Sequence, residues 1–218
     1  MPDLLITGTD TGVGKTVVAA ALVMWLRQRG VRAIGFKPAE TGVSGEAPSD
    51  SDILARASAE QEPLATPLLT LCEPLAPALA AERAGTALDV RELEARIDSL
   101  RSAGYSLVVE GAGGVLVPLA WGYTVLDLAE RKGLEAIIVG RAGLGSLNHL
   151  EMTAAMLRSR GVALRAVVLN GRSDTPDLAE STNPSALARL LPGVQVVVVP
   201  RHTVPDVIRA TLPFIASL

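Results

Sequence analysis

Residues 8–16 read GTDTGVGKT, and this stretch decides the fold of the chain. The apolar run Asp3–Thr7 before it predicts a buried strand, and the pattern of Lys15–Arg29 after it predicts a helix. Strand, glycine-rich turn and helix in this order form the context of a phosphate-binding P-loop. Glycines allow backbone N–H groups to point at phosphate oxygens, and the helix N-terminus adds a partial positive charge.

The loop is a variant of the P-loop pattern. The strict spacing requires the first glycine at position 9, which is Thr9, whereas the glycine here is Gly8. An ordinary strand–helix turn with a chance Gly-Lys-Thr is the alternative, but the position and density of the glycines favour the P-loop. No G-x-G-x-x-G dinucleotide fingerprint occurs. We expect Lys15 to reach the β- and γ-phosphates and the Thr16 hydroxyl to ligate Mg²⁺.

Short apolar runs alternate with helical patterns along the rest of the chain. Further strands are expected at Arg32–Phe36, Ser106–Val109, Glu135–Val139, Ala163–Leu169 and Val194–Val199. Helices are expected at Ser51–Ala59, Leu75–Arg83, Val90–Ala103, Thr124–Arg131, Ser146–Arg160, Ser185–Leu191 and Val204–Ser217, with a loop at Glu40–Asp50. Strands that are apolar throughout must be covered on both faces. We therefore predict an α/β fold: a single three-layer domain over residues 1–218, with a mostly parallel sheet flanked by helices, of the P-loop NTPase type.

Bulk properties narrow the class of protein. The chain has 218 residues, a formal net charge of -3 and a pI of about 5.5, which gives no reason to expect nucleic acid as a partner. Cys72 is the only cysteine, which excludes an intrachain disulfide and fits a reducing compartment. The sequence predicts no signal peptide, and no segment approaches the roughly 20 apolar residues of a membrane span. We expect a cytoplasmic protein with no membrane partner.

Polar residues follow the ends of two other predicted strands. Lys37 comes after the second strand, where it could approach the phosphates opposite Lys15, although a solvated surface lysine is the alternative. Glu110 ends the Ser106–Val109 strand, the Walker B location where a carboxylate holds Mg²⁺. The alternative is an exposed glutamate in a turn. Asp52 is a weaker metal candidate, because an aspartate before a helix is usually a cap.

Two further positions have polar or glycine-rich character. The segment GLGSLNH at 143–149 opens a helix and forms a second potential anion site, suited to a substrate carboxylate. His149 within it suits a catalytic base or, equally, a capping or packing role. Asn170 ends the Ala163–Leu169 strand, and its amide suits a purine edge. On sequence alone an ordinary Asn-Gly turn is the better interpretation of that residue.

Taken together, these motifs resemble the dethiobiotin synthetase family along nearly the whole chain. The matching segments are Gly8–Thr16, Lys37–Gly42, Ser51-Asp52, Val109–Gly114, Gly143–His149 and Asn170. Their order and spacing are specific, although each motif alone is modest. The resemblance implies a homodimeric ligase that uses ATP and Mg²⁺ to close the ureido ring of dethiobiotin from 7,8-diaminononanoate and CO₂. It also implies a path through a carbamate and its anhydride with phosphate.

The resemblance assigns roles by position. The catalytic residues it implies are Lys15, Lys37 and Thr11. The nucleotide and metal contacts it implies are Gly12, Val13, Gly14, Lys15, Thr16, Val17, Asp52, Glu110, Gly111, Ala112, Gly113, Asn170, Gly171, Pro200, Arg201 and His202, with Thr16, Asp52 and Glu110 on the metal. The substrate contacts it implies are Thr41, Gly143, Leu144, Gly145, Ser146, Leu147 and Asn148. The chain departs from other members at Gly12, where some have Glu, and at Thr41, where others have Ser.

Two other classes of P-loop protein are alternatives to this family. Amidating ligases of the cobyrinate type usually add a glutaminase domain with a nucleophilic cysteine, for which this chain is too short, and Cys72 has no evident catalytic setting. Partition-type nucleotide switches have a lysine in the loop where this chain has Asp10. The last predicted helix also lacks the basic face of a membrane-binding helix.

Overall fold

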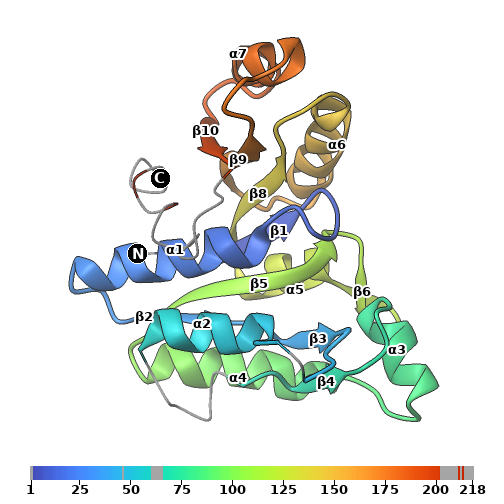
Figure 1. Cartoon of the computed structure of the whole chain (residues 1–218). Helices are drawn as coiled ribbons and strands as arrows, with labels where there is room; N and C mark the ends of the chain where they lie inside the picture. The colour runs from blue at the N-terminus through green and yellow to red at the C-terminus, as the bar shows by residue number, and fades with distance from the viewer. Residues whose placement is uncertain (1, 46, 60–65, 202–210, 212, 214–218) are drawn as a thin grey trace.

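A six-stranded sheet forms the centre of the computed structural model, which describes residues 2–45, 47–59, 66–201, 211 and 213. Its strands lie in the order β10-β9-β8-β1-β5-β2, and every neighbouring pair is parallel. Their bounds are β1 Leu4–Gly8, β2 Ala33–Phe36, β5 Ser106–Gly114, β8 Glu135–Arg141, β9 Leu164–Arg172 and β10 Gln195–Pro200. All six predicted strands are therefore present (Figure 1).

Helices cover both faces of this sheet. They are α1 Lys15–Gln28, α2 Asp50–Ser58, α3 Pro77–Arg83, α4 Val90–Ser102, α5 Val125–Lys132, α6 Ser146–Ser159 and α7 Leu178–Leu190. Apolar residues of α1 and α2 share one core cluster, and those of α4, α5, α6 and α7 share the other. Figure 1 shows α1 in front of the sheet and α5 behind it. The predicted three-layer α/β architecture is confirmed.

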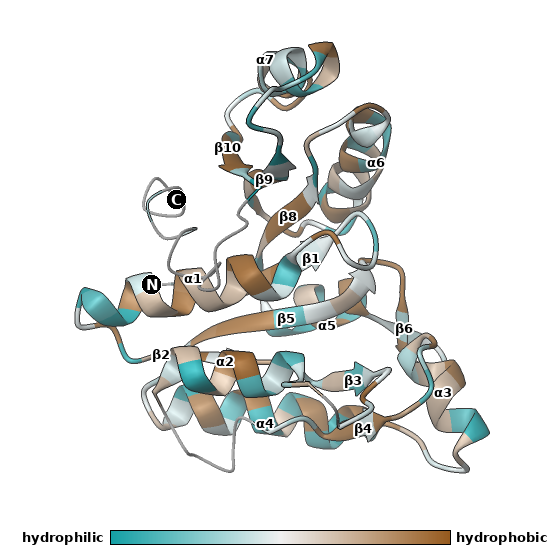
Figure 2. Ribbon diagram, viewed as in Figure 1, coloured by the Kyte–Doolittle hydropathy of each residue, from teal (hydrophilic) through white to brown (hydrophobic). Residues whose placement is uncertain are grey.

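The continuous apolar character of the strands follows from this layering. Along β5, Leu107 and Val109 join the cluster under α4 and α5, whereas Val108 joins the one under α1. Successive strand side chains point to opposite faces, so a strand covered on both sides needs an apolar residue at every position. In Figure 2, β8 and most of β5 are correspondingly brown. Among the described residues, none of the helices has the length and apolar character that spanning a membrane requires.

Several predicted boundaries were wrong. The predicted loop Glu40–Asp50 begins inside a strand, because β3 Ala39–Thr41 pairs with β4 Leu69–Leu71. A second small sheet joins β6 Pro118–Ala120 to β7 Tyr123–Thr124. Strand β5 continues past Val109 to Gly114, since Gly8 of β1 pairs with Gly114.

The helix predicted from Ser185 starts seven residues earlier. Asp177 and Glu180 form a capping box that begins α7 at Leu178, and the helix then continues past Pro184. Proline is unfavourable inside a helix, and Pro184 lies directly before the predicted start at Ser185. The predicted tail helix Val204–Ser217 lies outside the described residues, apart from positions 211 and 213.

Candidate active site at the carboxyl edge of the sheet

The glycine-rich loop has the conformation that its glycines allow. It joins the end of β1 to the start of α1, and Gly12 and Gly14 have φ values of 71° and 97°. Both lie in the left-handed region that favours glycine. A Cβ atom on Gly14 would also lie 2.0 Å from Nδ2 of Asn170. Gly14 is the residue before the first turn of α1, so no side chain covers the N–H groups there.

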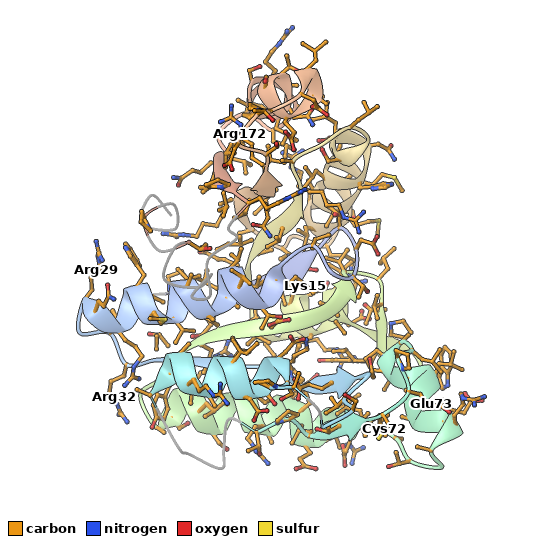
Figure 3. The ribbon with its side chains drawn as sticks, in the orientation of Figure 1. Lys15, Arg29, Arg32, Cys72, Glu73 and Arg172 are labelled. Carbon is orange, nitrogen blue, oxygen red and sulfur yellow. The ribbon has the colours of Figure 1, made fainter. Side chains whose placement is uncertain are left out.

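Lys15 lies at the start of α1, beside the carboxyl end of β5 (Figure 3). Its side chain is buried, and Nζ donates to the carbonyl of Asp10 at 3.0 Å. Burial lowers the pKa of Lys15, and the Glu110 carboxylate opposes this only in part. The Lys15 side chain therefore contacts its own loop, which is where a P-loop lysine reaches the β- and γ-phosphates.

A second buried lysine connects two carboxylates. Lys37 follows β2, and its Nζ lies 2.9 Å from Oε1 of Glu110 on β5 and also bonds Oδ2 of Asp50 on α2. The Thr16 hydroxyl donates to the same Glu110 oxygen at 3.0 Å. Glu110 and Lys37 are only 1% and 8% exposed, so the sequence alternatives of an exposed glutamate and a solvated lysine are wrong. We call Thr16, Lys37, Asp50 and Glu110 the charged cluster.

The ionisation of the charged cluster follows from burial and pairing. Burial acts to lower the pKa of Lys37, but the Glu110 and Asp50 carboxylates outweigh it, so this pKa lies above its usual value. For Asp50, burial acts to raise the pKa and the Lys37 ammonium outweighs it, which leaves the pKa lowered. Burial raises the pKa of Glu110, and Lys37 offsets this in part. Lys37 is accordingly a cation held in place by two acidic groups.

One oxygen of the cluster has no hydrogen-bond partner among the described residues. Oε2 of Glu110 is buried and unpaired, whereas Oε1 accepts from both Lys37 and Thr16. An unpaired carboxylate oxygen in a buried position is costly unless something else meets it. Two carboxylates and a hydroxyl are hard oxygen ligands of the kind that Mg²⁺ takes together with phosphate oxygens. The cluster contributes two such carboxylates, and the described ranges contain no group of three or more Asp, Glu, His or Cys side chains that could hold a metal.

Asp50, and not Asp52, lies in this cluster. Asp52 occupies the third helical position of α2, where Oδ2 accepts from the backbone N–H of Ser49 at 2.9 Å and the hydroxyl of Ser49 caps the helix in return. Asp52 is exposed and does not line the cavity. The structure therefore places Asp50, which the sequence suggested only as a cap, at the cavity in place of Asp52, and the metal role of either residue stays a prediction.

A cavity of about 810 Å³ opens above the charged cluster. Of the predicted site residues, it is lined by Thr11, Gly12, Gly14, Lys15, Thr16, Val17, Lys37, Thr41, Glu110, Ala112 and Gly113. One wall is apolar and was not foreseen; it comprises Ala39, Ile53, Pro74, Leu75, Ala76, Pro77 and Val117. Residues of the β4–α3 segment have no motif to mark them, so only the fold brings them here.

The other predicted residues lie outside this cavity. Asn170, near the end of β9, donates from Nδ2 to the carbonyl of Val13 at 2.9 Å and so contacts the P-loop. The adjacent Gly171 and the strand end at Pro200 and Arg201 belong to the same edge of the sheet, where the Arg201 N–H bonds the carbonyl of Arg172. His202 lies outside the described residues.

The turn before α6 forms a separate feature. Gly143, Leu144, Gly145, Ser146, Leu147 and Asn148 do not line the cavity. Gly145 precedes the first turn of α6 with φ 89°, and no side chain caps the helix N-terminus. His149 is exposed, and its carbonyl accepts from the Thr153 hydroxyl. The arrangement leaves the N–H groups of the first turn of α6 without a side-chain partner.

Nearly the whole chain matches known proteins. A family model described as an AAA domain matches residues 3–215. An ATP-dependent dethiobiotin synthetase of Anaeromyxobacter sp. (strain Fw109-5) is 43% identical over 191 residues, which is 87% of this chain and 86% of that protein. The same enzyme of Mycobacterium leprae (strain TN) is 43% identical over 88% of this chain and 84% of that protein. The chain belongs to the dethiobiotin synthetase family.

Solved structures of other proteins share the fold of this dethiobiotin synthetase family member. A Cyanothece McdA–ATP complex superposes with a TM-score of 0.58 at 14% identity, over 97% of this chain and 86% of that one. The MinC:MinD cell division protein complex of Aquifex aeolicus gives a TM-score of 0.54 at 13% identity, over 98% and 86%. At these identities the likeness shows only the fold, and it confirms the predicted P-loop NTPase type.

Proposed function

We propose that this chain is an ATP-dependent ligase that makes dethiobiotin in biotin biosynthesis. It joins CO₂ to the two amines of 7,8-diaminononanoate with cleavage of ATP to ADP and phosphate. The observation that carries the proposal is one cavity with a P-loop, two buried lysines and two carboxylates, in a chain of this family. Neither an amidating ligase nor a nucleotide switch is favoured by the family relationship.

The P-loop is the site for the triphosphate. Backbone N–H groups of residues 12–17, at the start of α1, suit the β- and γ-phosphates, and Lys15 supplies a cation within the loop. The purine side of the nucleotide is assigned by family resemblance to Asn170, Gly171, Pro200, Arg201 and His202. Asn170 already contacts Val13, so the base and phosphate regions share a residue.

Magnesium fits the charged cluster. Thr16, Asp50 and Glu110 would hold the ion, and the unpaired Oε2 of Glu110 supports this assignment. When bound, Mg²⁺ neutralises charge on the phosphate oxygens. Lys37 lines the cavity, and ion pairs to both carboxylates hold its ammonium in place. That position suits stabilisation of the negative charge that develops on the transferring phosphoryl group.

The chemistry needs orientation more than a strong base. One amine of the substrate adds to CO₂ to give a carbamate, whose oxygen attacks the γ-phosphate; the second amine then closes the ring and releases phosphate. Thr11 and Thr41 line the cavity near Lys37 and suit the amines and the carbamate. Leu75, Pro77 and Val117 form an apolar wall suited to the alkyl chain of the substrate. Excluding water with such a wall strengthens every charge interaction beside it.

A homodimer would explain how the turn before α6 contacts substrate although it lies outside the cavity of its own chain. The substrate has a carboxylate at the far end from its amines, whereas the Gly143–Asn148 turn lies outside the cavity of its own chain. Leu144 on this turn, Met152 on α6 and Leu178 on α7 are 92%, 60% and 81% exposed, and exposed apolar residues on adjoining elements are typical of an interface. We therefore place this surface against a second copy, with the turn receiving the carboxylate. A cytoplasmic location also remains a prediction.

The test is phosphate release from Mg-ATP, measured with and without 7,8-diaminononanoate and bicarbonate, with mass detection of the product. We expect phosphate release that requires both compounds and yields dethiobiotin. Phosphate release that is indifferent to the diamine would reject the proposal and favour a nucleotide switch. Release that instead requires an amide donor would favour an amidating ligase.

A further inference from the structure

Asn183 is a buried polar residue that does not line the P-loop cavity. It lies within α7 and is 5% exposed. Its side-chain Nδ2 contacts three acceptors of the turn before α6: the carbonyl of Ala142 at 2.8 Å, the carbonyl of Gly143 at 3.0 Å and the hydroxyl of Ser146 at 3.2 Å. These partners are 37 to 41 residues away in the sequence. A single amide thus connects α7 to the turn.

The Ser146 hydroxyl completes a small network with this amide. It accepts from Asn183 and donates to the carbonyl of Gly143 at 2.8 Å, and Ser146 is itself 6% exposed. The carbonyls of Ala142 and Gly143, at the start of the turn, therefore both accept hydrogen bonds from buried side chains. Buried polar networks of this kind hold a backbone in one conformation when their members are satisfied.

We propose that Asn183 is a positioning residue for the carboxylate of the diamino acid substrate. Two carbonyl oxygens beside an anion site would repel a carboxylate, because carbonyl dipoles present their negative ends. The Asn183 amide donates to the oxygens of Ala142 and Gly143. The Ser146 N–H also bonds the Gly143 oxygen, so the next N–H groups of the first turn of α6, those of residues 147–148, are the polar groups that an anion meets. This inference rests on the proposed function and adds a residue to its substrate site.

The experiment compares two substrates in the full-length protein. One is 7,8-diaminononanoate, and the other is 2,3-diaminooctane, which has the same vicinal amines but no carboxylate. For Asn183→Ala we expect KM for the diamino acid to rise at least tenfold, with kcat within about twofold and KM for ATP unchanged. KM for 2,3-diaminooctane should stay within about twofold of the wild-type value. Ser146→Ala should change the same KM in the same direction by a smaller factor.

Ser185→Ala is the matched control, because Ser185 lies two residues further along α7, is exposed and bonds only the carbonyl of Thr182. It should leave every constant unchanged. Equal rises in KM for both diamines, a parallel rise for ATP, or no rise in either variant would overturn the inference. Ser146→Ala provides the answer if Asn183→Ala does not fold, as judged by its melting temperature. A wild-type protein that does not convert the diamino acid at all would instead reject the proposed function.

Discussion

The P-loop cavity and the turn before α6 are both suited to negative charge, but they are built in opposite ways. The cavity concentrates formal charges, because Lys15 and Lys37 line it together with Asp50 and Glu110. The turn has no charged side chain and offers backbone N–H groups, while Asn183 donates hydrogen bonds to the carbonyls of Ala142 and Gly143. The difference matches the work that the proposed function gives each region: the cavity would stabilise charge as it develops, and the turn would hold a constant carboxylate.

The largest expected effect tests the charged side of this comparison. Lys37→Ala should lower kcat roughly 10²- to 10³-fold, the usual cost of removing a group that stabilises transition-state charge. The matched control is Lys132→Ala, because both lysine side chains are buried to a similar extent, 9% and 10% exposed, and both pair with carboxylates, but Lys132 lies at the end of α5 outside the cavity. Steady-state kinetics measure kcat of both variants, and melting temperatures measure their stability. Equal loss of activity in both variants would show that burial, and not position, explains the result.

The next effect separates Asp50 from Asp52. Asp50→Asn should raise the Mg²⁺ concentration for half-maximal activity about 10- to 100-fold, as is typical when a metal site loses a ligand or its support. Asp52→Asn removes a carboxylate from the same turn of α2 but only weakens its capping box. Activity titrated against Mg²⁺ measures both. A larger shift for Asp52→Asn would restore the assignment that the sequence motif suggested.

A smaller effect, on dimer dissociation, is expected for the exposed Leu144 on the turn before α6. Leu144→Ser should raise the dimer dissociation constant at least about tenfold, because burial of a leucine side chain is worth roughly 1.5 to 3 kcal/mol and both copies change. Leu116→Ser is the control, since Leu116 is also exposed, at 54%, but lies between β5 and β6. Sedimentation velocity over a range of concentrations measures both. A monomeric wild-type protein, or equal effects of the two variants, would contradict the assignment of this surface.

The smallest effect concerns pH and stability. The pKa of Asp50 is lowered in the folded protein, so its pairing contributes stability above the unfolded pKa of about 3.9, and this contribution is lost as pH falls through the folded value. For a partly exposed pair we expect about 1 kcal/mol at neutral pH. Urea unfolding should show that Asp50→Asn is less stable than wild type at pH 7, and that this deficit is smaller at pH 3 because part of the contribution is lost there. Asn183→Ala, in the uncharged region, should give the same stability difference at both pH values.

Much of the P-loop side could be predicted from the sequence, because its residues are contiguous. Gly12, Gly14, Lys15 and Thr16 lie within five positions, and a strand–turn–helix unit fixes their arrangement locally. Glu110 could be predicted as well, since the carboxyl ends of parallel strands meet at one edge. The apolar wall from Pro74 to Pro77 could not, because no local pattern distinguishes it from an ordinary loop before a helix.

The sequence by itself determined the layered α/β fold, the phosphate loop and the resemblance to one family. Tertiary structure decided which acid faces the cavity: residues two apart on a helix are separated by about 200° around its axis, so Asp50 and Asp52 point in different directions. It also decided the contact of Asn183 with a turn some 40 residues away. Spacing in a motif reports only local geometry. Which side of α2 faces the cavity, and where α7 packs, depend on the core clusters that these helices join.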